Sequence, residues 1–170
     1  MKKIMKMMAM ALVAVAMTVG FAACSSSDDD NNGGGGSQSI TGKLNINYTF
    51  SDDLLAIADI QVTYIDSDGK TTKTETITTS PFKKEITYNS LPVTTSYTLQ
   101  ATLKSSYPEK DKYNISIQNG SIISSTAGAF KTGGTKGQET TVKKENIEQA
   151  IAKLKGYSLD GTISKDGSVK

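Results

Sequence analysis

Apolar and polar residues alternate in short runs over most of the chain beyond residue 40. In the first run Leu44, Ile46, Tyr48 and Phe50 are separated by single polar residues. Successive side chains of a β-strand point to opposite faces, so a period of two predicts a strand with one buried face. The same pattern continues over residues 58–66, 82–88, 93–103 and 113–117. We therefore expect an all-β body.

Turn signals separate these runs. Asp66-Ser67-Asp68-Gly69 is typical of a hairpin turn, because Gly tolerates the positive φ that closes it. The polar run 70–79 that follows predicts a solvated edge strand. Asn119-Gly120 is a second hairpin signal and predicts that residues 121–130 run back along the preceding strand.

One segment near the end of the chain has helical spacing. Val142, Ile147, Ala150, Ile151 and Leu154 share one face of a predicted amphipathic helix over about 141–155, which Gly156 would end. We expect its apolar stripe to lie on its own sheet, the more common case, or on a partner. The sequence thus predicts a β-sandwich domain over 40–130, followed over 131–170 by a loop, the helix and a short tail.

The segment from Leu91 to Leu103 gives the fold its finer prediction. The positions that carry a pattern are Leu91, Thr95, Tyr97, Leu99, Ala101 and Leu103. Their spacing resembles the E–F corner and F strand of fibronectin type III and related immunoglobulin-like domains. The resemblance implies an antiparallel sandwich in which the Tyr97 ring packs into the core and its hydroxyl bonds to backbone at the corner. A transthyretin-like sandwich would give a similar pattern, so both subfamilies stay open.

The first 23 residues have the layout of a secretory signal peptide. Lys2, Lys3 and Lys6 precede an uncharged run from Met7 to Ala23 that closes on small residues. A membrane-spanning helix needs about 20 apolar residues and is usually followed by basic ones. Here the run is followed by three aspartates, which favours export and cleavage.

The end of this run, Phe21-Ala22-Ala23-Cys24, resembles a bacterial lipobox. The resemblance implies that Cys24 is lipidated on sulfur and becomes the new N-terminus. The alternative is a plain signal peptide followed by a free cysteine. Cys24 is the only cysteine in the chain, and a lone thiol is a liability in an oxidising compartment, which favours lipidation.

The residues behind Cys24 resemble the export tag of surface lipoproteins of the Bacteroidota. The tag residues are Ser27, Asp28, Asp29 and Asp30, and the resemblance implies transfer to the outer face of the outer membrane. Alternatively, the aspartates only keep the linker soluble and away from anionic lipid, and the body faces the periplasm. The Gly-rich stretch that follows predicts a flexible tether, so residues 24–39 link the anchor to the body.

Composition restricts the chemistry. The chain has no His, and its one Cys is assigned to the anchor, so the usual bases and nucleophiles of acyl transfer and the common zinc ligand sets are missing. Catalysis would depend on carboxylates alone, as in glycoside hydrolysis. The candidates are Asp52, Asp53, Asp59, Glu75 and Glu85. No pattern selects a pair among them, so we expect no enzyme and no cofactor.

Metal and nucleic-acid binding are not expected either. The turn at 66–69 with Glu75 fits part of a calcium loop, but the loop's first position is Tyr64, and a hairpin turn explains the same residues. Three of the 19 basic side chains lie in the first 23 residues, so a processed chain keeps 16 basic against 17 acidic groups. Nucleic-acid binders carry basic faces instead.

Ligand contact is predicted at one loop. Tyr107 and Tyr113 bracket a polar stretch, where an exposed ring could stack on a sugar; alternatively, both pack at the rim of the sandwich. The sequence thus indicates a non-catalytic, lipid-anchored binding or adhesion module, with a protein or glycan ligand. The alternatives are an accessory glycan-binding lipoprotein of a polysaccharide-uptake system, or a small surface-fibre subunit that pairs through an edge strand such as 70–79.

Overall fold

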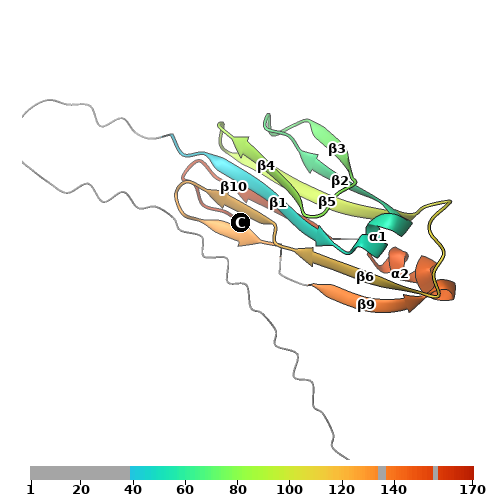
Figure 1. Cartoon of the computed structure of the whole chain (residues 1–170). Coiled ribbons are helices and arrows are strands. Elements are labelled where there is room, and N and C mark those ends of the chain that lie inside the picture. The colour runs from blue at the N-terminus through green and yellow to red at the C-terminus, as the bar shows by residue number, and fades with distance from the viewer. Residues whose placement is uncertain (1–38, 134–136, 155–156) are drawn as a thin grey trace, which may run out of the picture. The chain divides into compact units, whose positions relative to one another are not determined.

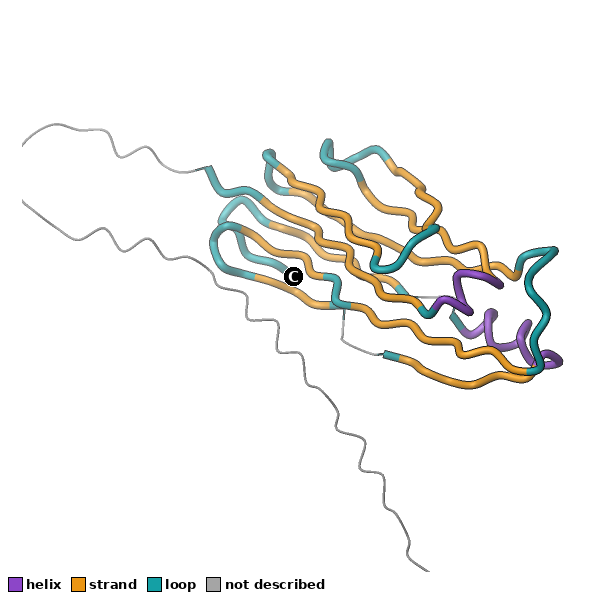
Figure 2. Tube along the Cα trace, in the orientation of Figure 1, coloured by secondary structure: helices purple, strands orange, loops and turns teal. Residues whose placement is uncertain are grey.

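The computed structural model describes residues 39–133, 137–154 and 157–170. The predicted signal peptide, Cys24, the export-tag residues and most of the tether lie outside this part of the chain. The described elements, shown in Figures 1 and 2, follow one another in this order: β1 (Gly42–Phe50), α1 (Asp52–Ile57), β2 (Ala58–Ile65), β3 (Thr72–Ile77), β4 (Phe82–Tyr88), β5 (Val93–Leu103), β6 (Lys112–Asn119), β7 (Ile122–Ser125), β8 (Phe130–Thr132), β9 (Gln138–Lys143), η1 (Lys144–Asn146), α2 (Ile147–Lys153) and β10 (Ser158–Ile163).

The strands form two antiparallel sheets. In the first sheet, β1 pairs with β4 from Gly42 to Tyr48, and its other edge pairs first with β7 and then with β6. β8 and β9 lie beyond β7 and β6 as the outer row. The second sheet has the order β10-β5-β2-β3. The all-β prediction is therefore confirmed.

The core lies between the inward faces of the strands. Every predicted inward residue of the first run is buried, and so are Ile60, Val62 and Tyr64 of β2. β5 continues the alternation with buried Val93, Thr95, Tyr97, Leu99 and Ala101. A period of two along each strand therefore sets which face meets the core, as the sequence predicts.

A short helix that the sequence pattern did not predict links the sheets. Ser51 caps α1 by accepting a hydrogen bond from the backbone N–H of Leu54, and Leu54 and Ile57 are buried. α1 follows β1 of the first sheet and leads directly into β2 of the second. In immunoglobulin constant domains the first two strands are neighbours in one sheet. The strand order here differs from that arrangement.

The hairpin predicted at Asn119-Gly120 is wrong. β6 and β7 run in one direction along β1 and keep one register, with Tyr48 opposite Asn119 and Asn45 opposite Ile122. The Asn119 side chain accepts a hydrogen bond from the Ser121 N–H at 2.9 Å, and the Gly120 N–H bonds to the Asn47 carbonyl at 2.9 Å. β6 and β7 thus act as one strand beside β1, and Asn119 stabilises the short break between them. The chain reverses direction only after Ser125, where β8 pairs with β7.

The sequence predicted that the sandwich ends at residue 130, but strands of both sheets lie beyond that residue, and the last of them, β10, ends at Ile163. The stretch expected as an exposed loop contributes β8 and the start of β9, and the tail supplies β10. The helix begins at Ile147, because residues 138–143 pair with β6, and it precedes a strand of the second sheet. Its apolar side docks on the body, where Ile147 and Ile151 are buried.

Tyr97 has different hydrogen-bond partners from those predicted. Its ring is buried, but its hydroxyl accepts hydrogen bonds from the Tyr48 hydroxyl and from Asn119 Nδ2, both at 3.0 Å. Burial, reinforced by the Tyr97 hydroxyl, raises the pKa of Tyr48. The geometry of a tyrosine corner, a hydroxyl bonded to backbone a few residues upstream, is made by Tyr113, which donates to the Pro108 carbonyl at 2.9 Å.

The turn at residues 66–69 is confirmed. Gly69 has φ +68°, and its N–H bonds to the Asp66 carbonyl at 2.9 Å. Asp68 Oδ1 accepts the N–H groups of Lys70 at 2.8 Å and Thr71 at 2.7 Å. Hydrogen bonds from the Thr71 side chain and then from these backbone groups lower the pKa of Asp68 to about 2. β3 then follows as the edge strand of the second sheet.

This turn carries a testable pH dependence. The folded-state pKa of Asp68 lies below the ordinary value of 3.8, so its stabilising contribution is present above pH 3.8 and is lost as the pH falls through about 2. We expect the side-chain carboxyl carbon of Asp68 to titrate in NMR spectra with a midpoint near 2. We also expect the stability difference between the natural protein and Asp68→Ala to narrow over the same interval. A midpoint near 3.8 would contradict this assignment.

Candidate functional site

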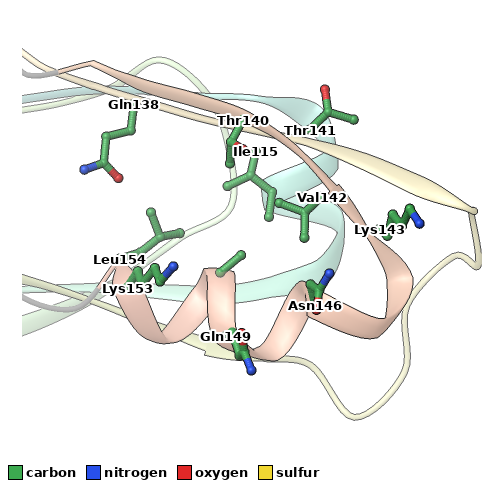
Figure 3. Close-up of a pocket in the computed structure, with 11 residues that line it drawn as sticks. Ile115, Gln138, Thr140, Thr141, Val142, Lys143, Asn146, Gln149, Lys153 and Leu154 are labelled. Atoms are coloured by element: carbon green, nitrogen blue, oxygen red, sulfur yellow. The ribbon is translucent and has the colours of Figure 1, made fainter.

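A groove of about 520 Å³ lies between β9 and α2 (Figure 3). Its volume falls in the range of about 300–1,000 Å³ that is usual for ligand sites. In Figure 3, Gln138 lies at the same end of the groove as Leu154 and Lys153, whereas Lys143 and Asn146 lie at the other end. The groove is thus bounded by the outermost row of the first sheet and by the helix.

The groove lies where the inner side of β9 is left uncovered beside α2. β10 pairs with β5 only from Val93 to Thr98, and α2 packs beside β5 and β9. Gln138, Thr140 and Val142 pair with buried residues of β6 and therefore point toward the interior. Of these three only Val142 is buried, so the inner side of β9 stays open over the rest of its length.

The lining combines an apolar floor with a polar and basic rim. The floor consists of Ile115, Val142, Ala150 and Leu154. Amide and hydroxyl groups lie around it on Gln138, Thr140, Thr141, Asn146 and Gln149. The remaining lining residues are Lys143 and Lys153, both exposed. These groups offer apolar contact, hydrogen bonds and positive charge to a ligand.

The loop predicted to touch a ligand is held by Tyr113. This residue is 1% exposed, its hydroxyl donates to the Pro108 carbonyl, and it accepts the Lys110 N–H at 2.9 Å. Tyr107 is half-buried, and its ring packs edge-on against that of Tyr113 with centroids 6.1 Å apart. Both rings therefore pack at the rim of the sandwich, which is the alternative considered from the sequence, although the Tyr113 hydroxyl bonds to backbone.

The candidate carboxylates take part in separate surface contacts. Asp53 accepts from Lys110 at 2.5 Å and from the Asn114 N–H at 2.7 Å, and these bonds lower its pKa. Glu75 accepts from Lys84 at 2.5 Å and from the Tyr64 hydroxyl, and its pKa is likewise lowered. Glu85 pairs with Lys43 at 2.9 Å. Asp52 and Asp59 lie on α1 and β2, and within the described ranges no three acidic, His or Cys residues gather as a metal site.

Two features escaped the sequence reasoning. The groove depends on β9, whose residues lie partly in a stretch expected to be a loop and partly in the expected helix. Phe130 on β8 is 69% exposed and is the single large hydrophobic residue so exposed in the described part of the chain. The next residue along β8, Lys131, approaches Asp160 of β10 in the second sheet at 3.7 Å. Because neighbouring residues of a strand point to opposite faces, a strand predicted at 130–132 would have placed Phe130 on the outer face.

Comparison with known proteins assigns no family. No family model matches the chain, and no curated protein matches it. In the part of the chain that the structure describes, no helix is both long and apolar enough to cross a membrane.

Proposed function

We propose that the chain is a lipid-anchored lipoprotein of the outer membrane, displayed on the cell surface, whose β-sandwich acts as a non-catalytic binding or adhesion module. The observation that carries this proposal is the order of the N-terminal segments. A basic and apolar leader ends at Ala23 and is followed by Cys24, three serines, the acidic residues 28–30 and a Gly-rich tether. A folded body with an open groove beyond such a tether is suited to meeting a ligand.

The anchor is strong enough for this role if Cys24 carries the acyl chains of a lipoprotein. Each buried CH₂ contributes about 0.8 kcal/mol, so a single chain holds a protein only marginally and two or more hold it stably. The acidic residues next to the anchor would be repelled by anionic lipid. Anchor, tag and tether therefore act together to hold the sandwich away from the membrane surface.

We also propose that the sandwich belongs to the broad immunoglobulin-like class. The two packed antiparallel sheets and the buried alternation of β5 support this proposal. β1 and β2 lie in different sheets, which weighs against the constant-domain arrangement. We therefore retain the transthyretin-like alternative in preference to the fibronectin type III-like one.

Replacement of the anchor residue tests the proposal. We expect Cys24→Ala to move the protein from the membrane fraction to the soluble fraction, and the mass of the natural protein to exceed that of its processed chain by the acyl groups. Ser26→Ala serves as the matched control and should stay in the membrane. A natural protein without added acyl mass, or a Cys24→Ala variant that stays membrane-bound, would contradict the proposed anchor.

Surface display is tested in the same cells by changing Asp28, Asp29 and Asp30 to Ala. Protease added to intact cells should digest the natural protein and spare the triple variant, which would remain anchored but face the periplasm. Equal digestion of both would show that the aspartates are no export signal. The anchor and the display can thus fail separately.

A second candidate function, accessory glycan binding, is favoured by Phe130. Its exposed ring shares the outer face of the first sheet with polar side chains of β1, such as Asn45, and an aromatic ring with polar neighbours can stack on a sugar. A fibre subunit is less favoured at β3. There Lys73 pairs with Asp66 at 2.6 Å and Glu75 with Lys84 at 2.5 Å, and charges on an edge strand discourage pairing with another chain.

A further inference from the structure

We propose that the groove between β9 and α2 binds an extended peptide segment of a partner protein, which adds to β9 as a further strand and carries alternating apolar and acidic side chains. This inference rests on the proposed binding function and names its partner class. Three independent features of the described residues support it: an open strand edge, an apolar floor in register with that edge, and a basic rim.

The open edge is that of β9. This strand pairs with β6 over six residues, from Lys143 opposite Lys112 to Gln138 opposite Ile117, and it is the last strand of its sheet in the described structure. The outer edge of such a strand presents backbone N–H and C=O groups that can pair with an added chain. Six residues extend over about 20 Å, which is enough to bind a short extended segment.

The floor lies where the side chains of an added strand would point. Every second residue of such a strand would face inward beside Gln138, Thr140 and Val142. Leu154 lies across the groove from them in Figure 3, and Ala150 lines the groove from α2. Ala150 is half-buried and small, so it leaves room for an apolar side chain of the ligand. This arrangement favours a peptide with apolar residues at alternate positions.

The rim gives the peptide its charge. Lys143 and Lys153 line the groove, and no carboxylate is among the lining residues. Lys143 approaches Glu145 only at 3.7 Å, with both side chains about two thirds exposed, so this ion pair is weak. The neighbouring Lys144 is paired with Glu109 at 2.7 Å. Lys143 and Lys153 are thus placed to attract acidic side chains on the ligand.

The edge of β9 differs from that of β3. β3 carries Lys73 and Glu75, the second of which lies at its centre, and both make close ion pairs with neighbouring elements. β9 carries its charges nearer its ends, on Glu139 and Lys143, and its two central residues, Thr140 and Thr141, are uncharged. A strand edge without central charges is the more receptive to another strand. The added strand is therefore assigned to β9.

The test uses the full chain as cells produce it, with a phage library of random dodecapeptides as the probe. We expect the enriched peptides to alternate apolar and acidic residues. Fluorescence anisotropy with the best synthetic peptide should show binding weakened about tenfold or more by Ala150→Trp, which fills the groove, as expected for loss of a buried anchor contact. Gln61→Trp, on the outer face of β2, is the matched control and should bind within about twofold of the natural protein.

Charge reversal tests the rim. Lys143→Glu combined with Lys153→Glu should weaken binding of the acidic peptide about fivefold or more and favour a version with lysine in place of each acidic residue. Lys70→Glu, an exposed lysine on the turn before β3, should leave the affinity unchanged. If both sets of variants bind the acidic peptide equally well, the basic rim plays no part and the proposal is wrong.

Hydrogen exchange distinguishes strand addition from other ways of filling the groove. Bound peptide should slow exchange of backbone N–H groups in residues 138–143 and leave those of 72–77 unchanged. If Ala150→Trp does not fold, Thr140→Trp replaces it, because this exposed residue also points into the groove and a large uncharged side chain there would fill it. Absence of any enriched peptide, binding without protection of β9, or binding only to a glycan array would overturn the inference. None of these results alters the fractionation of Cys24→Ala, so the anchor proposal is tested independently.

Discussion

Replacement of Tyr97 with alanine is expected to lower the free energy of unfolding by about 3–5 kcal/mol, the usual cost of removing a large aromatic side chain from a core. The Tyr97 ring is buried and packs edge-on against Tyr48, with ring centroids 5.9 Å apart. Tyr97 is on β5 and Tyr48 is on β1, so the pair joins the two sheets. Domains are typically stable by only about 5–15 kcal/mol, so this one change should bring the body close to unfolding.

Part of the stability lost in Tyr97→Ala comes from the hydrogen bonds of the Tyr97 hydroxyl. Tyr97→Phe keeps most of the ring contacts but leaves the Tyr48 hydroxyl and Asn119 Nδ2 without their partner on β5. A buried polar group without a partner costs about 1–3 kcal/mol, so we expect a loss in that range for Tyr97→Phe. Urea unfolding followed by circular dichroism measures both variants. Tyr107→Ala, in a half-buried position at the rim, is the control and should cost less than Tyr97→Ala.

A loss below about 1 kcal/mol for Tyr97→Ala would contradict this picture, because a surface position behaves in that way. Equal losses for Tyr97→Phe and Tyr97→Ala would instead place the whole effect in the hydroxyl. The double variant Tyr48→Phe with Tyr97→Phe tests whether the two hydroxyl groups stabilise the core through their mutual hydrogen bond. If the hydroxyl pair is coupled, the losses of Tyr48→Phe and Tyr97→Phe should not add.

The sequence predicted those strands whose own apolar and polar residues alternate clearly. The alternation from Leu44 to Phe50 and along β5 could be read from the chain, because a period of two determines which side chains share a face. The turn at 66–69 could also be predicted, because its hydrogen bonds join residues at most five apart. At these positions the local preference and the final fold agree.

The missed features depend on partners far along the chain. Asn119-Gly120 has the local signature of a hairpin, but Asn119 is bonded to Tyr97, 22 positions away, and Gly120 to Asn47. β9 and β10 are polar and short, and each becomes a strand by pairing with β6 or β5. Tertiary pairing therefore overrides the helical spacing that begins at Val142.

The same reason explains what the sequence could say about the candidate site. The anchor and tag are contiguous motifs, so they could be proposed from the sequence. The groove requires that β9 end near the start of α2 and that β10 stop short of the C-terminal half of β5. Ala150 and Thr140 line the same groove only because of that arrangement. No pattern within either segment indicates a shared cavity.

The second large effect is expected at Ile151, on the buried side of α2. Ile151 is buried in the core, whereas Gln149, Ala150 and Lys153 line the groove. Ile151→Ala should lower the free energy of unfolding by about 2–5 kcal/mol, since it leaves a cavity at the seam that α2 closes between β5 and β9. Glu148→Ala, at an exposed position of the same helix, is the control and should change stability by less than about 0.5 kcal/mol.

A comparison of Ile151 and Ala150 also tests whether one residue of α2 mainly stabilises the fold and its neighbour mainly contacts the ligand. Helices of seven residues are not stable alone in water, so α2 depends on its buried side for its position. Ala150→Trp should therefore weaken peptide binding while the unfolding midpoint stays close to that of the natural protein. Ile151→Ala should lower the midpoint first and affect binding only as the helix loosens. If Ile151→Ala left the midpoint unchanged, α2 would not be part of the cooperative core, and the groove would lack a fixed wall on which a ligand could depend.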